Sequence, residues 1–468
     1  MLEPAYQADV VVVGAGVAGL SAAHRLTSAG VTTMVLEAAH GVGGRMATEK
    51  VDGFRLDRIG QLLSTAYPEL RLTPGLGTLV LRPFAPGVLL HGDGRHHRAG
   101  VQAGTRGARG ALHAVRALAS APRPPSVPRP PRRPVAVPGR QVSAPRSRSG
   151  APLGTAVDQA RLGAALTRLA GTPAERLLAR PELPAGEALA ARGLPARTID
   201  GFLRPLLAAL LCDPDLTTSS RCADLALRAF AGGRLCLPEG GAEALPELLA
   251  STLPPGSVHT GVRVTSVSTT SVTTAEHGEI RCRAVLVATG ARAAAELLPG
   301  LRVPEFHPVT VVHHTTDEPP ATGSSLLLDA DLGGPVAHTA VVSRVDPSRA
   351  PAGRALVSST VLGRPPGDVD TAVRMHLARL YGVSTARWET LAVHHTAEAV
   401  PAMRPPHDLR RPVRLIAGLY VCGDHRDTST VQGALHSGHR ASAAILADLG
   451  AGRSLHVADP LPTVPRAA

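Results

Sequence analysis

The stretch Asp9-Val-Val-Val-Val-Gly-Ala-Gly-Val-Ala-Gly19 decides the fold, because it joins a short β-branched strand to a glycine-rich turn. A helical pattern follows from Leu20 to Ala29, and Val31–Leu36 predicts a second strand that ends in Glu37. A strand, a glycine turn, a helix, a strand and an acid within about thirty residues form the βαβ unit that binds a dinucleotide. The sequence therefore predicts an α/β fold with a Rossmann-like lobe.

Each glycine of this turn has a physical purpose. Gly14 allows the tight turn, Gly16 lets the backbone approach a pyrophosphate, and Gly19 lets the helix pack closely against the strand. The phosphates then face the positive N-terminus of the helix. Glu37, 18 residues after Gly19, is placed to accept hydrogen bonds from a ribose and disfavours a 2′-phosphate.

A second glycine-rich loop, Gly41-Val-Gly-Gly-Arg-Met46, comes directly after the second predicted strand. Gly43 and Gly44 can let backbone N–H groups meet a diphosphate, and Arg45 can add charge-assisted hydrogen bonds. A dehydrogenase that binds only NAD does not need this second loop. The two loops together are much more specific than either one.

Residues 14–20 (GAGVAGL), 36–38 (LEA) and 43–48 (GGRMAT) resemble the superfamily of flavin-containing amine oxidases and phytoene desaturases, which also includes protoporphyrinogen oxidases and carotenoid isomerases. The resemblance implies FAD as the cofactor, with Glu37 on the adenosine ribose and Gly43, Gly44 and Arg45 near the diphosphate and flavin. Residues 57–61 (DRIGQ) are similar to the next family segment, which often reads Asp-x-Gly, with one extra residue here.

Later segments extend the resemblance. Residues 237–241 (LPEGG) resemble the Pro-x-Gly-Gly lead-in to the second part of the FAD lobe, and Val262 stands where the family has an adenine-contacting valine. Residues 418–424 (GLYVCGD) resemble the strand and turn that close the flavin site through Gly423 and Asp424, with Asp424 on the ribityl chain or the diphosphate.

The final helix is expected to begin where its positive N-terminus faces the flavin pyrimidine ring. That dipole would stabilise the reduced, anionic flavin. The family pattern assigns this position to Gln432, Gly433 and Ala434.

The order of these segments predicts two lobes. The FAD-binding domain is discontinuous, and a substrate domain of the α+β type, with a helical part and an antiparallel sheet, is inserted into it. We expect the FAD-binding domain to comprise residues 1–90, 234–300 and 410–450, and the substrate domain residues 153–233 and 301–409. Residues 451–468 are expected to be a flexible tail.

The positive charge is concentrated in one segment. The chain of 468 residues has a formal net charge of +12, and twelve arginines without any Asp or Glu lie between Arg95 and Arg148. Removing these twelve from the 49 basic residues leaves 37, equal to the 37 acidic residues. Residues 121–152 contain ten prolines, so residues 91–152 are expected to be a disordered basic insertion.

The composition also limits partners and location. The basic segment lacks interleaved aromatics for base stacking, so no nucleic acid is expected, while peripheral contact with an anionic membrane stays open. The five cysteines are odd in number and form no CxxC pair, which predicts neither a disulfide scaffold nor a zinc site, and no metal is expected. No basic start precedes an apolar run, so a cytoplasmic location is expected.

The substrate is predicted to be small and apolar, of the polyene or isoprenoid kind, oxidised by hydride transfer to the flavin with oxygen or a quinone as acceptor. Amine chemistry is disfavoured, because amine-oxidising relatives often use a lysine and an aromatic cage near the flavin. The one lysine, Lys50, lies beside the GGR segment, and Trp388 and Tyr420 are the aromatics near the C-terminal motif. A flavin-dependent isomerase, an amine oxidase and a non-catalytic binding protein that kept the fold remain the alternatives.

Three histidines are the candidates for acid–base chemistry near the flavin: His394, His395 and His425. His394 and His395 are adjacent in a predicted strand, so their side chains point to opposite faces and only one can face the site. The competing interpretation of each is a surface or hydrogen-bonded histidine. Cys422 invites a covalent flavin link, but a small buried residue beneath the turn is the favoured interpretation.

Overall fold

A parallel sheet forms the centre of the FAD-binding lobe in the computed structural model, which describes residues 8–100 and 153–450. Its strands lie in the order β10 (Val258–Thr260), β2 (Thr33–Glu37), β1 (Ala8–Val13), β13 (Gly278–Val287) and β20 (Leu419–Val421), all parallel to their neighbours. The β-branched run of β1 is buried on both faces, as a central parallel strand requires.

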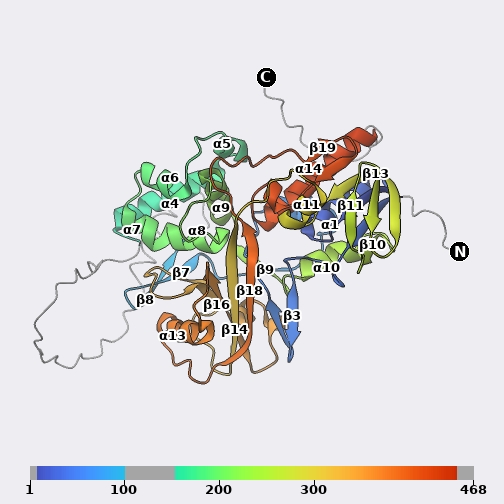
Figure 1. Cartoon of the computed structure of the whole chain (residues 1–468). Helices are drawn as coiled ribbons and strands as arrows, with labels where there is room; N and C mark the ends of the chain where they lie inside the picture. The colour runs from blue at the N-terminus through green and yellow to red at the C-terminus, as the bar shows by residue number, and fades with distance from the viewer. Residues whose placement is uncertain (1–7, 101–152, 451–468) are drawn as a thin grey trace, which may run out of the picture.

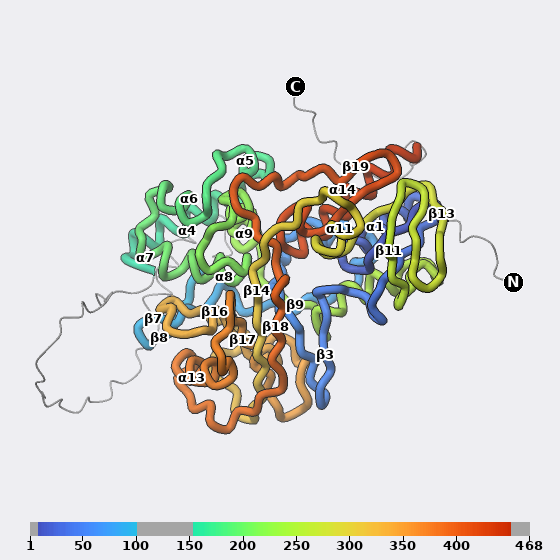
Figure 2. The backbone as a smooth tube through the Cα atoms, viewed as in Figure 1, coloured from blue at the N-terminus to red at the C-terminus, as the bar shows by residue number. Residues whose placement is uncertain are grey.

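This lobe is built from three separated parts of the chain. Figure 2 shows the N-terminal, middle and C-terminal segments running together on one side of the molecule. Strands β11 (Val264–Val267) and β12 (Ser271–Thr274) extend the sheet in antiparallel fashion beyond β13, and β19 (Arg414–Ile416) pairs with β20. The predicted discontinuous Rossmann-like lobe is therefore confirmed.

Two long helices pack together in this lobe, α1 (Val17–Ser28) and α14 (Val431–Leu449). Their backbones approach so closely that a Cβ atom on Gly438 of α14 would lie 2.3 Å from the carbonyl oxygen of Ala18. Shorter helices α10 (Ala244–Ser251) and α11 (Ala291–Leu297) complete the lobe. The glycine at position 438 is thus required by helix packing.

The second lobe contains a seven-stranded sheet below a group of helices (Figure 1). The sheet is antiparallel apart from the parallel pair β15–β7. Its order is β18 (Glu389–Pro401), β14 (Phe306–Thr316), β17 (Ala355–Leu362), β16 (Val336–Val341), β15 (Leu327–Asp329), β7 (Val88–Gly92) and β8 (Arg95–Ala99). Helix α13 (Val369–Tyr381) packs Val373, Leu377 and Leu380 against this sheet.

The helical part begins with α4 (Ala156–Gly171), where Thr155 and Asp158 form a capping box. Leu162 and Leu166 bury one face of this helix. The helices that follow are α5 (Ala174–Leu178), α6 (Ala185–Ala191), α7 (Ala196–Thr198), the π-helical turn η1 (Ile199–Leu203), α8 (Arg204–Leu211) and α9 (Ser220–Gly232). The α+β character of the inserted lobe is confirmed.

Small elements connect the two lobes. A hairpin of β3 (Thr48–Val51) and β4 (Phe54–Asp57) follows the second glycine loop, and β5 (Leu63–Ser64), β9 (Leu235–Pro238) and β6 (Leu81–Pro83) form a three-stranded sheet. Short helices α2 (Glu69–Leu72), α12 (Val342–Val345), η2 (Pro347–Arg349) and η3 (Asp424–Arg426) complete the described chain. The buried guanidinium of Arg349 reaches across to Asp57, with 2.8 Å between Nη2 and Oδ2.

One predicted domain boundary needs correction. The sequence assigned residues 1–90 to the FAD-binding domain and 91–152 to a disordered insertion, whereas β7 and β8 form the edge of the substrate-lobe sheet. The reason is the pairing of β7 with β15, which lies far away in sequence, so no local pattern announces it. Residues 101–152 and 451–468 of the predicted insertion and tail lie outside the described residues.

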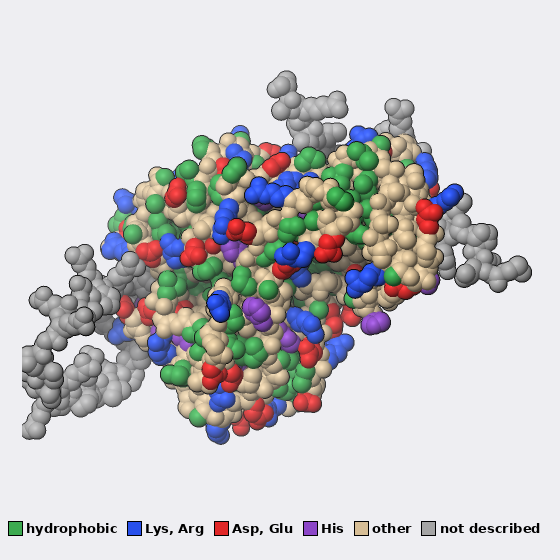
Figure 3. Space-filling view, in the orientation of Figure 1, with side chains coloured by type: hydrophobic (Ala, Val, Ile, Leu, Met, Phe, Trp, Pro, Cys, Tyr) green, Lys and Arg blue, Asp and Glu red, His purple; other side chains and the backbone are tan. Residues whose placement is uncertain are grey.

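Acidic and basic side chains are interspersed on the face of the molecule shown in Figure 3, in keeping with the near-balance of charge outside the Arg95–Arg148 segment. Among the described residues, no helix combines the length and the apolar character that a membrane crossing requires.

Candidate FAD site

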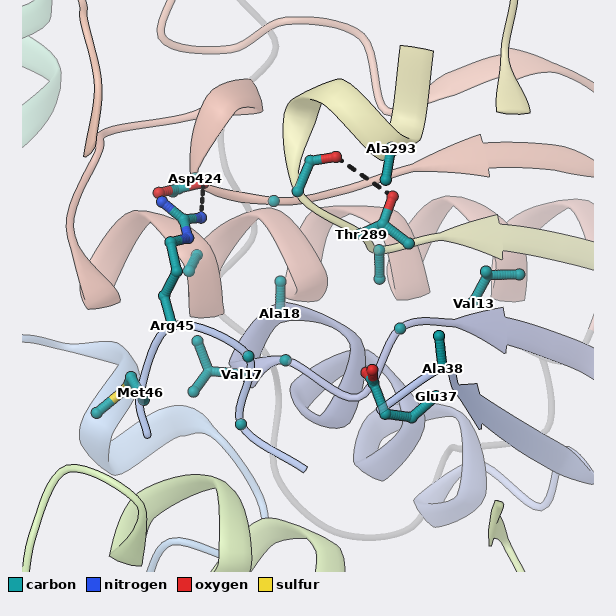
Figure 4. A pocket seen from close by; sticks show the side chains of 18 of the residues that line it. Val13, Val17, Ala18, Glu37, Ala38, Arg45, Met46, Thr289, Ala293 and Asp424 are labelled. Atoms are coloured by element: carbon teal, nitrogen blue, oxygen red, sulfur yellow. Dashed lines mark hydrogen bonds and ion pairs between the residues drawn. The ribbon is translucent and has the colours of Figure 1, made fainter. Parts of the chain in front are cut away.

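A cavity of about 540 Å³ lies between the elements that carry the predicted motifs. Figure 4 shows Glu37 at one end, facing Thr289 and Ala293, and Arg45 with Asp424 at the other, with Val17 and Ala18 of α1 between them. The lining comes from both ends and the middle of the chain. From the predicted set it includes Gly14, Gly16, Glu37, Gly43, Gly44, Arg45, Val262, Gly423, Asp424 and Ala434.

The carboxylate of Glu37 lies at one end of the cavity. Its Oε2 accepts a hydrogen bond from the Ala15 N–H (2.8 Å) and its Oε1 accepts one from Ala39 N–H (2.9 Å). The N–H of Val262 donates to the backbone oxygen of Glu37 at 2.9 Å, which places Val262 beside the acid. A carboxylate has about four acceptor sites, so Glu37 keeps capacity for ribose hydroxyls.

The first glycine turn has the geometry that a pyrophosphate needs. Gly14 has φ of +107°, and a Cβ on Gly19 would lie 2.1 Å from the Gly14 oxygen. Gly16 has no atom within 4 Å of its Cβ position and is the N-cap of α1, where no side chain caps the helix. The first N–H groups of α1 can therefore serve an anion.

The second glycine loop closes onto the first. Gly43 (φ +108°) donates its N–H to the Ala15 oxygen at 2.9 Å, and Gly44 has φ of +57°. Gly43 thus fixes one loop against the other. The sequence suggested that its N–H faces a diphosphate, but in the structure this N–H is already bonded to Ala15. A Cβ at Gly43 would lie 2.9 Å from both the Met46 oxygen and the ring of Pro246.

Arg45 and Asp424 meet although 379 residues separate them. Nη2 of Arg45 lies 2.6 Å from Oδ1 of Asp424, and Nη1 donates to the Ala399 oxygen at 2.9 Å. Both side chains line the cavity and are paired with each other. A diphosphate or ribityl chain bound here would lie against a guanidinium donor and a carboxylate acceptor held side by side.

The turn at Gly423 and Asp424 is bonded to helix α14, which packs beneath it. Gly423 has φ of +142°, and its N–H donates to Oγ of Ser437 at 2.9 Å. Cys422 is fully buried, and burial raises the pKa of its thiol to about 12. This environment suits the small buried residue favoured above and disfavours a reactive thiolate.

The start of α14 differs in detail from the prediction. Thr430 caps the helix through a hydrogen bond from the Gly433 N–H, and Gln432 accepts one from the Glu69 N–H at 3.0 Å. Of the three predicted residues only Ala434 lines the cavity, together with Thr430 and Val431. Because successive helical residues are rotated by about 100°, Gln432 faces α2 and Gly433 packs on Thr428.

Comparison with known proteins decides the family. The model of the family described as flavin containing amine oxidoreductase matches residues 17–446. The chain belongs to this family. The match confirms the predicted superfamily, the FAD cofactor and the oxidoreductase class.

Individual relatives are similar over a limited part of their length. The chain is 46% identical over 98 residues to putrescine oxidase of Kocuria rosea, which covers 20% of each protein. It is 35% identical over 100 residues to one of the subunits of limonene dehydrogenase of Castellaniella defragrans, which covers 19% of this chain and 18% of the relative. The chain thus aligns with about one fifth of the length of these curated relatives.

Solved structures share the fold over nearly the whole chain. An oxidoreductase of Methanosarcina mazei superimposes with a TM-score of 0.66 at 16% identity, covering 93% of this chain and 99% of the other. Putrescine oxidase bound to putrescine superimposes with a TM-score of 0.63 at 18% identity, covering 95% of this chain and all of the other. At these identities the likeness establishes the fold alone.

None of the three candidate histidines of this family member is among the residues that line the cavity. His395 is exposed, with Nδ1 2.8 Å from Thr310 Oγ1, and His394 is partly buried 3.8 Å from Glu49. The two point to opposite faces, as predicted. His425 lies 3% exposed behind Gly423, where burial lowers its pKa from 6.5 to about 4.

The end of the cavity near Arg45 and Asp424 borders a buried apolar cluster. Ile59 and Ala399 line the cavity and belong to a buried cluster with Val309, Val311 and Val400. The Cβ position of Gly60 lies 3.8 Å from a methyl group of Val311, which places the sheet of the second lobe directly against this end.

The groups expected of an amine site lie elsewhere. Lys50 is 62% exposed and pairs with Glu243 at 3.2 Å. Trp388 is buried in the core beneath α13, and Tyr420 is buried with its hydroxyl bonded to Asp448. Within the described residues, no aromatic side chain lines the cavity.

Helix α11 and the turn before it contribute lining residues that the sequence motifs did not predict. Thr289, Gly290, Ala293, Glu296 and Leu297 all line the cavity opposite Glu37. The available signal was the Thr289-Gly290 pair directly after the strand β13, since a strand followed by glycine and a helix repeats the form of the first motif.

Proposed function

We propose that this protein oxidises or desaturates a small apolar metabolite, of the polyene or isoprenoid kind, with FAD as the hydride acceptor. The apolar surface that Ile59 and Ala399 give to the cavity, with the buried Val309, Val311 and Val400 packed behind them, carries this proposal. Such a surface favours a hydrocarbon part of a substrate over a cationic amine, which needs a carboxylate or an aromatic partner.

The residues of the chain bind and orient the cofactor. Glu37 would hold the adenosine ribose, the start of α1 the pyrophosphate, and Arg45 with Asp424 the part nearest the flavin. When bound, FAD supplies the hydride acceptor, so removal of hydrogen from an apolar substrate depends on its position against the flavin more than on a protein base. The lack of a histidine among the described lining residues agrees with this.

The names of the relatives refer to both apolar and amine substrates. One is named for limonene, a hydrocarbon, and another for putrescine, a diamine. The apolar border at Ile59 and the placement of Lys50 and Trp388 away from the cavity favour the first kind of substrate.

Anaerobic titration of the oxidised holoprotein tests the proposal. A panel of isoprenoid and polyene compounds should bleach the flavin absorption band, whereas putrescine should leave it unchanged. Bleaching by the diamine alone would reverse the assignment.

Reoxidation then identifies the electron acceptor. We propose oxygen or a quinone, and reduced protein mixed with each should recover the oxidised flavin spectrum with one of them. If substrate is converted without any net use of either acceptor, the protein is instead a flavin-dependent isomerase.

A further inference from the structure

His91 and Asp329 lie side by side in the sheet of the second lobe. They are register partners on the parallel strands β7 and β15, so their side chains emerge on the same face. Asp331 follows two residues after Asp329 in the loop beyond β15. One coordinating atom from each of the three residues lies within 4.8 Å of the others.

The imidazole of His91 is aimed into this group. The residue is 8% exposed, and its Nδ1 is buried without a hydrogen-bond partner among the described residues. Oδ2 of Asp331 lies 3.5 Å from this nitrogen. A buried ring nitrogen that faces two carboxylates and makes no hydrogen bond is the arrangement expected of a ligand atom.

The carboxylates are already oriented. Asp329 accepts hydrogen bonds from the N–H groups of Asp331 (3.0 Å) and Gly333 (2.7 Å). Asp331 accepts from the Asp93 N–H, with 3.1 Å to Oδ2.

His376 supports Asp329 from α13. Its Nδ1 accepts the Val336 N–H at 3.1 Å, so in the neutral ring Nε2 carries the proton, and Nε2 lies 3.2 Å from Oδ2 of Asp329. A histidine behind a ligating carboxylate fixes the orientation of that carboxylate, as outer residues do in metal sites.

We propose that His91, Asp329 and Asp331 bind a divalent transition-metal ion of the Zn²⁺ kind, with His376 as a positioning residue. One imidazole and two carboxylates suit such an ion, whereas Mg²⁺ and Ca²⁺ prefer oxygen ligands alone. Bonds of about 2.0–2.1 Å place tetrahedral ligand atoms roughly 3.3 Å apart, close to the 3.5 Å between His91 and Asp331.

The site stands apart from the flavin chemistry. Neither β7, β15 nor the loop that carries Asp331 contributes a lining residue to the FAD cavity. Figure 1 shows β7 next to β8 in the second lobe, and β15 pairs with β7 there. The side chain of Asp331 is 42% exposed, which gives an ion access from solvent. A bound ion would tie the end of β7 to the loop after β15.

Equilibrium dialysis of the untagged holoprotein against Zn²⁺, followed by metal analysis, tests the site. We expect one ion per chain from this site. His91→Gln and Asp331→Asn should each weaken binding at least tenfold, and His376→Gln should weaken it by about 10–100-fold. His97→Gln is the matched control, because His97 is paired with Leu90 and faces the other side of the sheet.

The flavin spectrum and the circular dichroism of each variant verify that it is folded. Asp331→Asn changes a partly exposed side chain and keeps the test available if His91→Gln fails to fold. Uptake of no Zn²⁺ by the wild type, or equal affinity in the wild type and Asp331→Asn, would overturn the proposal.

Discussion

We propose that Glu37 recognises the adenosine half of FAD. Glu37→Gln removes the charge while keeping one acceptor oxygen, and hydrogen bonds to a charged group contribute about 1.5–3 kcal/mol. We therefore expect the FAD dissociation constant of the apoprotein to rise about 10–100-fold, measured by quenching of flavin fluorescence. Glu305→Gln, in an exposed ion pair with Arg404, is the control, and equal affinity in both variants would remove Glu37 from the site.

His338 of β16 predicts an acid-sensitive fold. Burial lowers the pKa of His338 from 6.5 to about 4. Between these pH values, this histidine is protonated in the unfolded chain and neutral in the folded protein. Stability therefore falls as the pH drops from about 6.5 towards 4, by about 1 kcal/mol for this histidine at about pH 5.5.

Thermal melting at about pH 7.5 and 5.5 measures this effect. His338→Gln should lose less melting temperature on acidification than the wild type, whereas His395→Gln, at an exposed position, should lose as much. A wild-type melting temperature that does not change between the two pH values would contradict the assignment.

Single residues were predictable where a backbone requirement selects them. Gly14, with its positive φ angle, and Glu37 follow from turn geometry and hydrogen-bonding capacity, whereas Gly423 was expected from the family resemblance. Gln432 was not, because its direction depends on the cap formed by Thr430 and on the Glu69 N–H that it accepts.

The close contact between helices α1 and α14 depends on the glycine at position 438. A Cβ at Gly438 would lie 2.3 Å from the Ala18 oxygen, so Gly438→Ala must push the helices apart, at a cost of about 1–3 kcal/mol. We expect a lower melting temperature and weaker FAD binding, since α1 begins at the proposed pyrophosphate site.

Gly163→Ala in α4 is the matched control, because its Cβ position has no atom within 4 Å. Alanine is favoured over glycine in a helix by about 0.5–1 kcal/mol, so this variant should melt at the same temperature or higher. Equal melting temperatures for the two variants would show that α1 and α14 can move apart without loss of stability.

Elements with a strong local signal could be predicted from sequence, and those defined by distant partners could not. The βαβ unit follows from periodicity and glycine placement. Strands β7 and β8 contain short runs with arginine and histidine and gain their place from β15, which lies more than 200 residues further on.

At the scale of the whole molecule, the buried pair Arg349–Asp57 holds the second lobe to the hairpin β3–β4. Arg349→Met would leave Asp57 buried without its cation, which costs about 3–5 kcal/mol. Arg387→Met, which breaks the exposed pair with Glu318, should cost about 0–1 kcal/mol. Denaturant unfolding measures the free energy of unfolding of both variants. Equal decreases in the two variants would show that the Arg349–Asp57 pair does not stabilise the contact between the lobes.

Titration of the apoprotein with FAD, with FMN in a parallel cell, tests whether the discontinuous lobe binds FAD. Glycine turns from both ends of the chain line one cavity, which Val262 and α11 also line. We predict saturation at one FAD per chain, with FMN at least tenfold weaker because it lacks the adenosine half. An apoprotein that binds no FAD, or binds FMN equally well, would contradict the account.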